Sequence, residues 1–317
     1  MPGFRTEIKI ARSAFSLNHQ DHFFCIGSCF ADHIHSRLRE DFFYSGCNPC
    51  GIVYNPFSIS HQMMQVLDGK MWDENDLVYH DDLYHGMHHH GSYSHPDKVI
   101  ALDGMNKSLI AAQHNLYQVS CMVITLGTAI VYTLKERDIL VANCHKIPAS
   151  HFDRRMLSVQ EIVDSNTSWI ARITDQNPGI KIILTISPVR YLKEGFTDNT
   201  LSKARLALAV EQLCKTFHQV HYFPAYEILL DDLRDYRFYK EDMIHPGDQA
   251  IDYIWEAFLH AYMDNETMGL IKTLKKIKSG LAHRPLHENT PAHTLFVKRL
   301  NDQINEMKSK YPFINFG

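Results

Sequence analysis

Residues 22–38 read His-Phe-Phe-Cys-Ile-Gly-Ser-Cys-Phe-Ala-Asp-His-Ile-His-Ser-Arg-Leu, and this stretch decides the fold. The apolar run at 22–26 is typical of a buried strand. A helix is predicted over 31–38, because Phe30, Ile34 and Leu38 recur every fourth residue and share one face. Gly27 permits the sharp turn between the two elements. The pattern therefore places Ser28 at a strand-to-helix junction.

Ser28 has two interpretations at this junction. Unpaired backbone N–H groups and the positive end of the helix dipole converge on the first turn of a helix. A serine there can attack a carbonyl carbon while its own N–H helps to hold the oxyanion. Serine is also a very common N-cap, and position alone favours that structural role. A nucleophile additionally needs a base elsewhere in the chain.

A candidate base occurs at residues 242–246, which read Asp-Met-Ile-His-Pro. A serine hydroxyl becomes a nucleophile when a histidine takes its proton, and a carboxylate fixes the tautomer of that histidine. A single turn could bring Asp242 back to the ring of His245. The segment after Pro246 predicts a helix, so His245 lies on a short loop before it. The alternative is a helix-entry loop whose side chains bond only the local backbone.

The chain alternates between short apolar segments and helical patterns. Core strands are predicted at 22–26, 121–126, 181–186 and 220–223, and helices at 107–119, 158–176 and 202–217. This alternation is typical of an α/β fold with a doubly wound, mostly parallel sheet. Such sheets bind ligands at the carboxyl ends of their strands. Ser28, Thr128 and Ser187 are expected at that edge.

Several ordered motifs resemble one known family. Residues 27–31, Gly-Ser-Cys-Phe-Ala, match the motif that names the GSCFA family. The resemblance extends over roughly residues 4–262 and includes the segments 48–56, 125–129, 143–146, 187–190, 222–227, 233–239 and 242–246. That family resembles a branch of the SGNH (GDSL-like) hydrolases. The resemblance implies a flavodoxin-like three-layer α/β/α hydrolase with no cofactor, in which Ser28 is the nucleophile, His245 the base and Asp242 its orienting carboxylate.

Two features depart from the SGNH pattern. The residue before the serine is Gly27, where an Asp is usual, and the usual Gly-x-Asn block is replaced by Gly127-Thr128-Ala129. The asparagine that would complete the oxyanion hole is therefore missing. Substitute donors or substrate-binding groups are expected among a set of residues near the strand ends: Gly51, Asn55, Gly127, Thr128, Asn143, His145 and Arg190. Asn143 and His145 could instead lie on a solvated loop, and Arg190 could form a structural salt bridge.

Residues 70–97 are expected to form a long loop-like insertion rich in His, Asp, Tyr and Gly. Long loops in compact domains are often functional, and a lid carrying Tyr84, Tyr93 and a histidine is the favoured interpretation. A metal site is the alternative, because several histidines cluster here: His85, His88, His89, His90 and His95. Their spacing does not match a helix-borne zinc site, so no metal ligand is assigned.

The chain divides into two expected parts. A hydrolase domain covers residues 1–262 and includes a β-hairpin at 129–146, and a C-terminal helical extension covers 263–317. A helix over 290–311 carries an apolar face of Phe296, Leu300, Ile304 and Met307. This helix is expected to pack on the domain or to join two copies into a homo-oligomer.

Composition limits the partners. The chain has 317 residues, 45% of them hydrophobic, and a net charge of −4. This charge offers no basic field for nucleic acid or an anionic membrane. There is no apolar run of transmembrane length, residues 1–10 lack a signal-like apolar core, and the seven cysteines are an odd number. We therefore expect a reduced, cytoplasmic protein.

These observations favour a serine esterase that removes an O-acyl group, such as acetyl, from a carbohydrate or small metabolite. Acyl transfer to an alcohol is a variant of the same chemistry. A non-catalytic carbohydrate-binding protein on a hydrolase-like fold is an alternative, motivated by the missing asparagine. A metal-assisted hydrolase that uses the histidine cluster is a further alternative.

Overall fold

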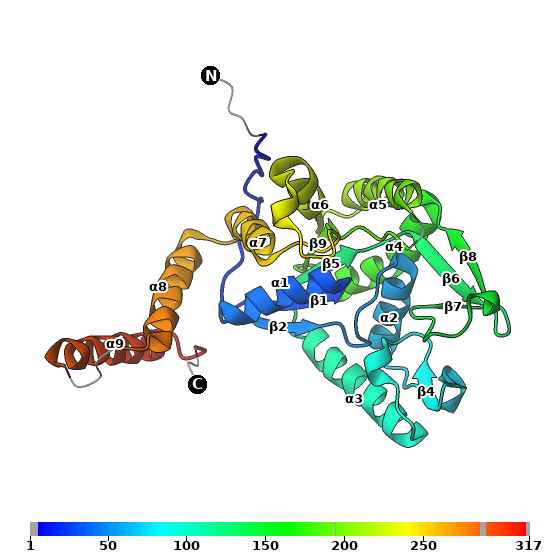
Figure 1. Ribbon diagram of the computed structural model, residues 1–317, viewed down its shortest axis with the longest axis horizontal. Helices are drawn as coiled ribbons and strands as arrows, with labels where there is room; N and C mark the ends of the chain where they lie inside the picture. The colour runs from blue at the N-terminus through cyan, green and yellow to red at the C-terminus, as the bar shows by residue number, and fades with distance from the viewer. Residues whose placement is uncertain (1–5, 194, 286–289, 315–317) are drawn as a thin grey trace.

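The computed structural model describes residues 6–193, 195–285 and 290–314. Its centre is a five-stranded parallel sheet (Figure 1). From one edge to the other the strands are β10 (Val220–Phe223), β9 (Lys181–Ile186), β5 (Cys121–Leu126), β1 (His22–Gly27) and β2 (Tyr44–Cys47). This is the flavodoxin-like order, with the topological switch point between β1 and β5. The predicted α/β class and doubly wound sheet are confirmed.

Helices cover both faces of the sheet. Alternate strand residues separate into two cores, with Phe23 and Cys25 in one and Phe24 and Ile26 in the other. The first core is completed by α1 (Cys29–Glu40) and α7 (Asp248–Tyr262). The second is completed by α2 (Pro56–Asp68), α3 (Lys98–Leu116), α4 (Val159–Gln176) and α5 (Phe196–Thr216). The result is a three-layer α/β/α arrangement.

Two smaller sheets extend from this body. The strands β6 (Ile130–Leu134), β7 (Ile139–Val141) and β8 (Phe152–Met156) form an antiparallel sheet in the order β7-β6-β8. The sequence pattern predicted the hairpin of β6 and β7 but not β8. Residues 70–97 are not a loop, because β3 (Leu77–His80) and β4 (Leu83–Gly86) pair antiparallel there.

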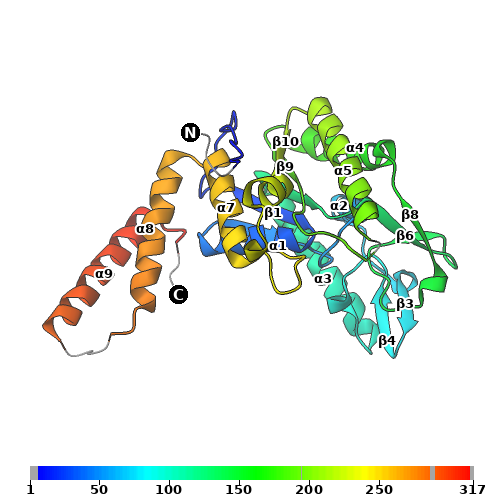
Figure 2. The ribbon, with the colours of Figure 1, turned by 45° about the horizontal axis from the view of Figure 1, so that its top comes forward.

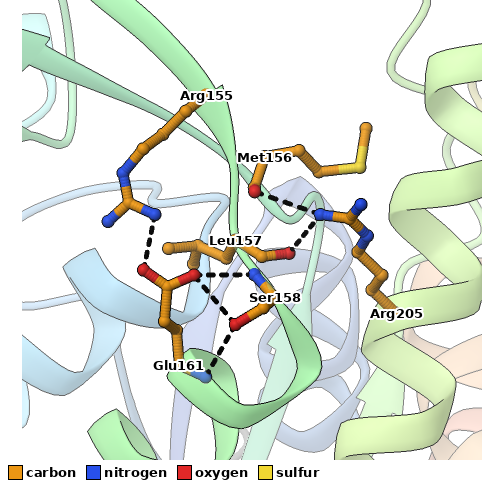
Figure 3. Close-up of polar contacts among 6 residues, drawn as sticks. All are labelled: Arg155, Met156, Leu157, Ser158, Glu161 and Arg205. Carbon is orange, nitrogen blue, oxygen red and sulfur yellow. Dashed lines mark hydrogen bonds and ion pairs between the residues drawn. The ribbon is translucent and has the colours of Figure 1, made fainter.

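The β8–α4 junction fixes this small sheet to the main body. Figure 3 shows a capping box at the start of α4, in which the Glu161 N–H donates to Ser158 Oγ and Glu161 Oε2 accepts from the Ser158 N–H. Arg155 of β8 pairs with Glu161. From α5, Arg205 donates to the carbonyls of Met156 and Leu157, so one guanidinium joins a helix to the strand end.

The C-terminal helices α8 (Asn265–Ala282) and α9 (Pro291–Lys310) form a hairpin that projects from the main body (Figure 2). Of the expected apolar face of α9, Leu300 is buried and Phe296 is 39% exposed. Pairing of two chains through this face stays a prediction. None of the helices in the described ranges is long and apolar enough to cross a membrane.

The β1–α1 turn depends on a glycine. Gly27 has φ +135°, and a Cβ there would lie 2.1 Å from the carbonyl oxygen of Thr125 on the neighbouring strand β5. The Gly27 N–H donates to Asn48 Oδ1 at 2.8 Å, and its carbonyl accepts from the Val53 N–H at 3.0 Å. Both the dihedral angle and the space exclude a side chain at this position.

We expect Gly27→Ala to lower the free energy of unfolding by about 3 kcal/mol or more, since the new methyl group must displace backbone atoms. Urea denaturation followed by circular dichroism measures this change. Gly104→Ala in α3 is the matched control, because a Cβ there meets nothing within 4 Å. It should be neutral or stabilising by up to about 1 kcal/mol. An equal effect of the two substitutions would contradict this account of the turn.

Candidate functional site

Ser28 lies directly after β1, at the switch point of the sheet, and is 2% exposed. It is the N-cap of α1, and its Oγ accepts a hydrogen bond from the Phe30 N–H at 3.3 Å. The structural role that its position suggested is therefore present. The cap also fixes the hydroxyl at the carboxyl edge of the sheet, where ligands of this fold bind.

Asp242 and His245 lie on the loop that precedes α7. Asp242 Oδ1 accepts hydrogen bonds from the N–H groups of Ile244 and His245, both at 2.9 Å. Its Oδ2 lies 2.7 Å from Nδ1 of His245. Met243 between them has φ +56°, a left-handed conformation that closes this tight turn. The spacing seen in the sequence thus brings the carboxylate to the imidazole.

The same hydrogen bonds set the charge of Asp242. The backbone N–H groups of His245 and Ile244, together with the imidazole, lower the pKa of this carboxyl to about 2. Since the pKa in the fold lies below the usual value, the stabilisation is complete above about pH 4 and is lost as the pH falls through 2. An ionised carboxylate beside Nδ1 favours the tautomer that carries its hydrogen on Nδ1, and in that tautomer Nε2 of His245 is the basic nitrogen.

Ser28 and His245 line one pocket of about 280 Å³, although they lie far apart in the sequence. The helices that follow them, α1 and α7, lie side by side (Figures 1 and 2). Within the described residues no hydrogen bond joins the two side chains. The rest of the pocket wall is Cys29, Tyr54, Gly127, Thr128, Ser187, Val189, Arg190, Tyr191, Leu192 and Ile244.

Two expected oxyanion donors are already engaged. The Gly51 N–H donates to the Asn48 carbonyl at 2.8 Å, and Gly51 does not line the pocket. The expectation for Gly51 is therefore wrong, because a local turn uses its N–H. The Ser28 N–H donates to the Thr125 carbonyl at 3.1 Å. The Cys29 N–H is the first of α1, and helix geometry leaves it without an intrahelical acceptor.

A second hollow of about 330 Å³ adjoins the pocket and shares Tyr54, Thr128 and Tyr191 with it. Asn55 and Asn143 line this second hollow. Asn55 Oδ1 accepts from the Ser58 N–H at 2.8 Å as the cap of α2, so its amide Nδ2 is the group left to donate. Asn143 Oδ1 accepts from the N–H of His145 at 2.9 Å. Both asparagines stay candidates for the missing donor.

His145 and Arg190 lie on different walls. His145 is buried, and its Nε2 lies 3.0 Å from the Gly86 carbonyl. Burial lowers the pKa of His145 to about 4, so this imidazole is neutral at pH 7. Arg190 lines the Ser28 pocket and hydrogen-bonds to Tyr239. It also lines a third hollow of about 750 Å³ on the far side of the Asp242 loop.

Three residues of α5 that hold the pocket wall were not predicted from the sequence. Asn199 Oδ1 accepts from the Tyr191 N–H, and Ser202 Oγ accepts from the Ala129 N–H and lies 3.1 Å from Thr128 Oγ1. Lys203 Nζ donates to the carbonyls of Gly127 and Ser187. All three α5 residues are buried. Their signal was available as polar side chains at the start of a helix whose later turns are apolar on the buried face.

The histidine-rich segment lies away from this pocket. None of residues 70–97 lines the pocket of Ser28 or the hollow next to it, so the lid prediction gains no support. The imidazole of His89 is fully buried against Trp72, with their ring centroids 4.7 Å apart. Tyr93 donates its hydroxyl to the Pro49 carbonyl and packs in the core. In the described part of the chain, no group of three or more His, Cys, Asp or Glu is arranged to hold a metal ion.

Two family models match separate parts of the chain. The family model "GSCFA family" matches residues 22–258, and "GSCFA domain protein, C-terminal domain" matches residues 274–317. No curated protein matches the chain. Among solved structures, a carbohydrate esterase family 3 from Talaromyces cellulolyticus is similar with 13% identity and a TM-score of 0.28. That match covers 52% of this chain and 66% of the esterase, so the chain spans about two thirds of its length. Because these family models together match most of the chain, the chain belongs to the GSCFA family.

Proposed function

We propose that this protein is a serine-dependent ester hydrolase that removes an O-acyl group, such as acetyl, from a carbohydrate or other small metabolite. One observation carries the proposal. Ser28 lines the same pocket as a histidine whose Nδ1 is held 2.7 Å from an ionised carboxylate. A serine, an imidazole and an orienting carboxylate are the parts of an acyl-transfer triad.

The reaction would run in two steps. Ser28 Oγ attacks the acyl carbon while His245 Nε2 takes its proton, and the tetrahedral oxyanion forms beside the start of α1. His245 then protonates the leaving alkoxide and the acyl-enzyme remains. Water attacks in the second step by the same route. We assign the N–H of Cys29 to the oxyanion as a donor, and the amide of Asn55, which lines the adjoining hollow, is the candidate for a second donor.

The residues that line the pocket and the neighbouring hollow suit an ester of a small acyl group with a polar alcohol. The small pocket of Ser28 is partly lined by the apolar side chains of Val189, Leu192 and Ile244. The larger hollow beyond His245 carries exposed aromatic rings at Phe196 and Tyr236. Aromatic faces can pack on the apolar faces of sugar rings while polar groups bond the hydroxyls.

A second candidate is a carbohydrate-binding protein without catalysis. Ser28 Oγ is engaged as a helix cap, and within the described residues it makes no hydrogen bond to His245. Catalytic hydrogen bonds are often long without substrate, so this geometry does not decide between the two candidates. Covalent reactivity of Ser28 distinguishes the hydrolase from the binding protein.

We expect a fluorophosphonate probe to label the wild-type protein and to leave both Ser28→Ala and His245→Ala unlabelled, since activation needs both groups. Labelling is measured by intact-protein mass spectrometry. Ser168→Ala and His260→Ala are controls, because these exposed residues lie outside the pocket and should not matter. A folded wild-type protein that stays unlabelled would favour the binding protein.

Asp242→Asn should slow labelling by about 10³- to 10⁴-fold, because the amide no longer fixes the tautomer that leaves Nε2 basic. The Oδ1 of Asn can still accept from the two backbone N–H groups, so the loop should persist. The measurement is the second-order labelling rate, with circular dichroism as the folding control. An Asn variant that reacts at the wild-type rate would remove Asp242 from the mechanism.

Acyl transfer is separated from hydrolysis by the product. With a p-nitrophenyl ester as acyl donor, a hydrolase releases the free acid even when a sugar alcohol is present, because water reaches the acyl-enzyme. A transferase instead yields the acylated sugar in proportion to the alcohol. We expect the acid, measured by chromatography of the products with and without the acceptor. Dominant formation of the acylated sugar would assign the transferase.

A further inference from the structure

Lys203 is a buried cation beside the proposed active site. It is 3% exposed, and its Nζ donates to the carbonyl of Gly127 at 2.7 Å and to that of Ser187 at 2.8 Å. Both carbonyl groups belong to residues that line the pocket of Ser28. The ammonium therefore bonds directly to the backbone of two residues of the pocket wall. Within the described residues no carboxylate forms an ion pair with Lys203.

The groups around Lys203 do not neutralise it. Cys29 of α1 and Arg190 of the loop after β9 are the ionisable groups that act on its charge, and the ring of Tyr226 from α6 (Ala225–Glu227) lies 5.4 Å away. The Cys29 thiol is itself held neutral, because burial raises its pKa. An ammonium in this position has two carbonyl dipoles and an aromatic ring but no anion.

Retaining this lysine weakens the fold near neutral pH. Burial lowers the pKa of Lys203 to about 7, well below its ordinary value. The folded state thus binds fewer protons than the unfolded state between pH 7 and about 10.5, and stability rises with pH over that range. An apolar side chain of similar length would avoid the cost of burying a charge. A costly buried charge beside a pocket indicates a functional role.

The proposed reaction forms an anion that could interact with the buried charge of Lys203. An ester carbonyl attacked by Ser28 becomes an oxyanion in the pocket whose wall Lys203 holds, and the usual asparagine donor is absent from the Gly127-Thr128-Ala129 segment. We propose that Lys203 is a positioning residue of this site: it fixes the ends of β5 and β9 through two carbonyls and gives the wall the positive charge that stabilises the oxyanion. This inference rests on the proposed function of Ser28.

The test follows the rate of fluorophosphonate labelling from pH 5 to 9 in the full chain. The variants are Lys203→Met, which removes charge and donors, and Lys203→Gln, which keeps an N–H donor and removes the charge. Lys215→Met is the matched control, because Lys215 is exposed on the same helix and pairs with Glu211. Chemical denaturation at each pH reports folding.

We expect both Lys203 variants to react about 10- to 100-fold more slowly than wild type at pH 6, because they lose one unit of positive charge from the wall that faces the oxyanion. The wild-type rate should fall toward that of the variants as the pH rises through the pKa of about 7, and Lys215→Met should follow wild type. The stability of wild type relative to Lys203→Met should also rise over that range.

Two results would overturn the role of Lys203 and leave the proposed function intact: a folded Lys203 variant that labels at the wild-type rate, or a wild-type adduct on Ser28 whose phosphonyl oxygens all face away from the Gly127 and Ser187 backbone that Lys203 holds. The second result is read from a structure of the labelled wild-type protein and needs no variant, so it decides even where both variants fail to fold. A wild-type protein that does not label at any pH would remove the proposed function, and with it the role of Lys203.

Discussion

The close approach of Gly27 to the backbone of β5 is the constraint on which the site depends. The main chain at Gly27 runs so near the Thr125 carbonyl that no side chain fits, and its φ of +135° turns the chain from strand into helix. The next residue then bonds the same carbonyl with its N–H and caps α1 with its hydroxyl. This single turn therefore fixes Ser28 at the switch point of a parallel sheet and aligns the first N–H of α1 with it.

Local hydrogen bonds position the other residues of the site. Asp242 builds its own loop by accepting from two backbone N–H groups, and the oxygen left over holds His245. On the opposite wall, α5 presents polar side chains that tie the loops after β5 and β9. The proposed site is thus a set of strand ends and helix starts, each satisfied by its neighbours, around one small pocket. Its charged groups are the carboxylate of Asp242, the buried ammonium of Lys203 and the guanidinium of Arg190.

Apolar periodicity predicted the interior strands β1, β5 and β9 well, because they are short runs of almost wholly buried residues. It also found the edge strand β10, whose two end residues are buried. It missed β2, whose sequence Tyr-Ser-Gly-Cys has no apolar pattern at the sheet edge, and α2, whose buried face includes Ser58 and Gln62. The spacing of Asp242 and His245 predicted their contact, because residues three apart are brought together by a single local turn. The Gly51 N–H is used by a local turn from Asn48 to Gly51, which the sequence Asn-Pro-Cys-Gly could have indicated. The histidine-rich segment was beyond such reasoning, because tertiary packing decides which histidines are buried in a core. Lys203 was missed because a lysine in a helical pattern is usually on a solvated face.

The most direct test of the central claim is a crystal structure of the protein after reaction with a fluorophosphonate. The account predicts phosphorus bonded to Ser28 Oγ, with Nε2 of His245 within about 3.2 Å of an oxygen of the adduct. It also predicts a phosphonyl oxygen facing the Cys29 N–H, on the side of the wall held by Lys203. Phosphorus on another residue, or a His245 ring turned away from an adduct at Ser28, would contradict it.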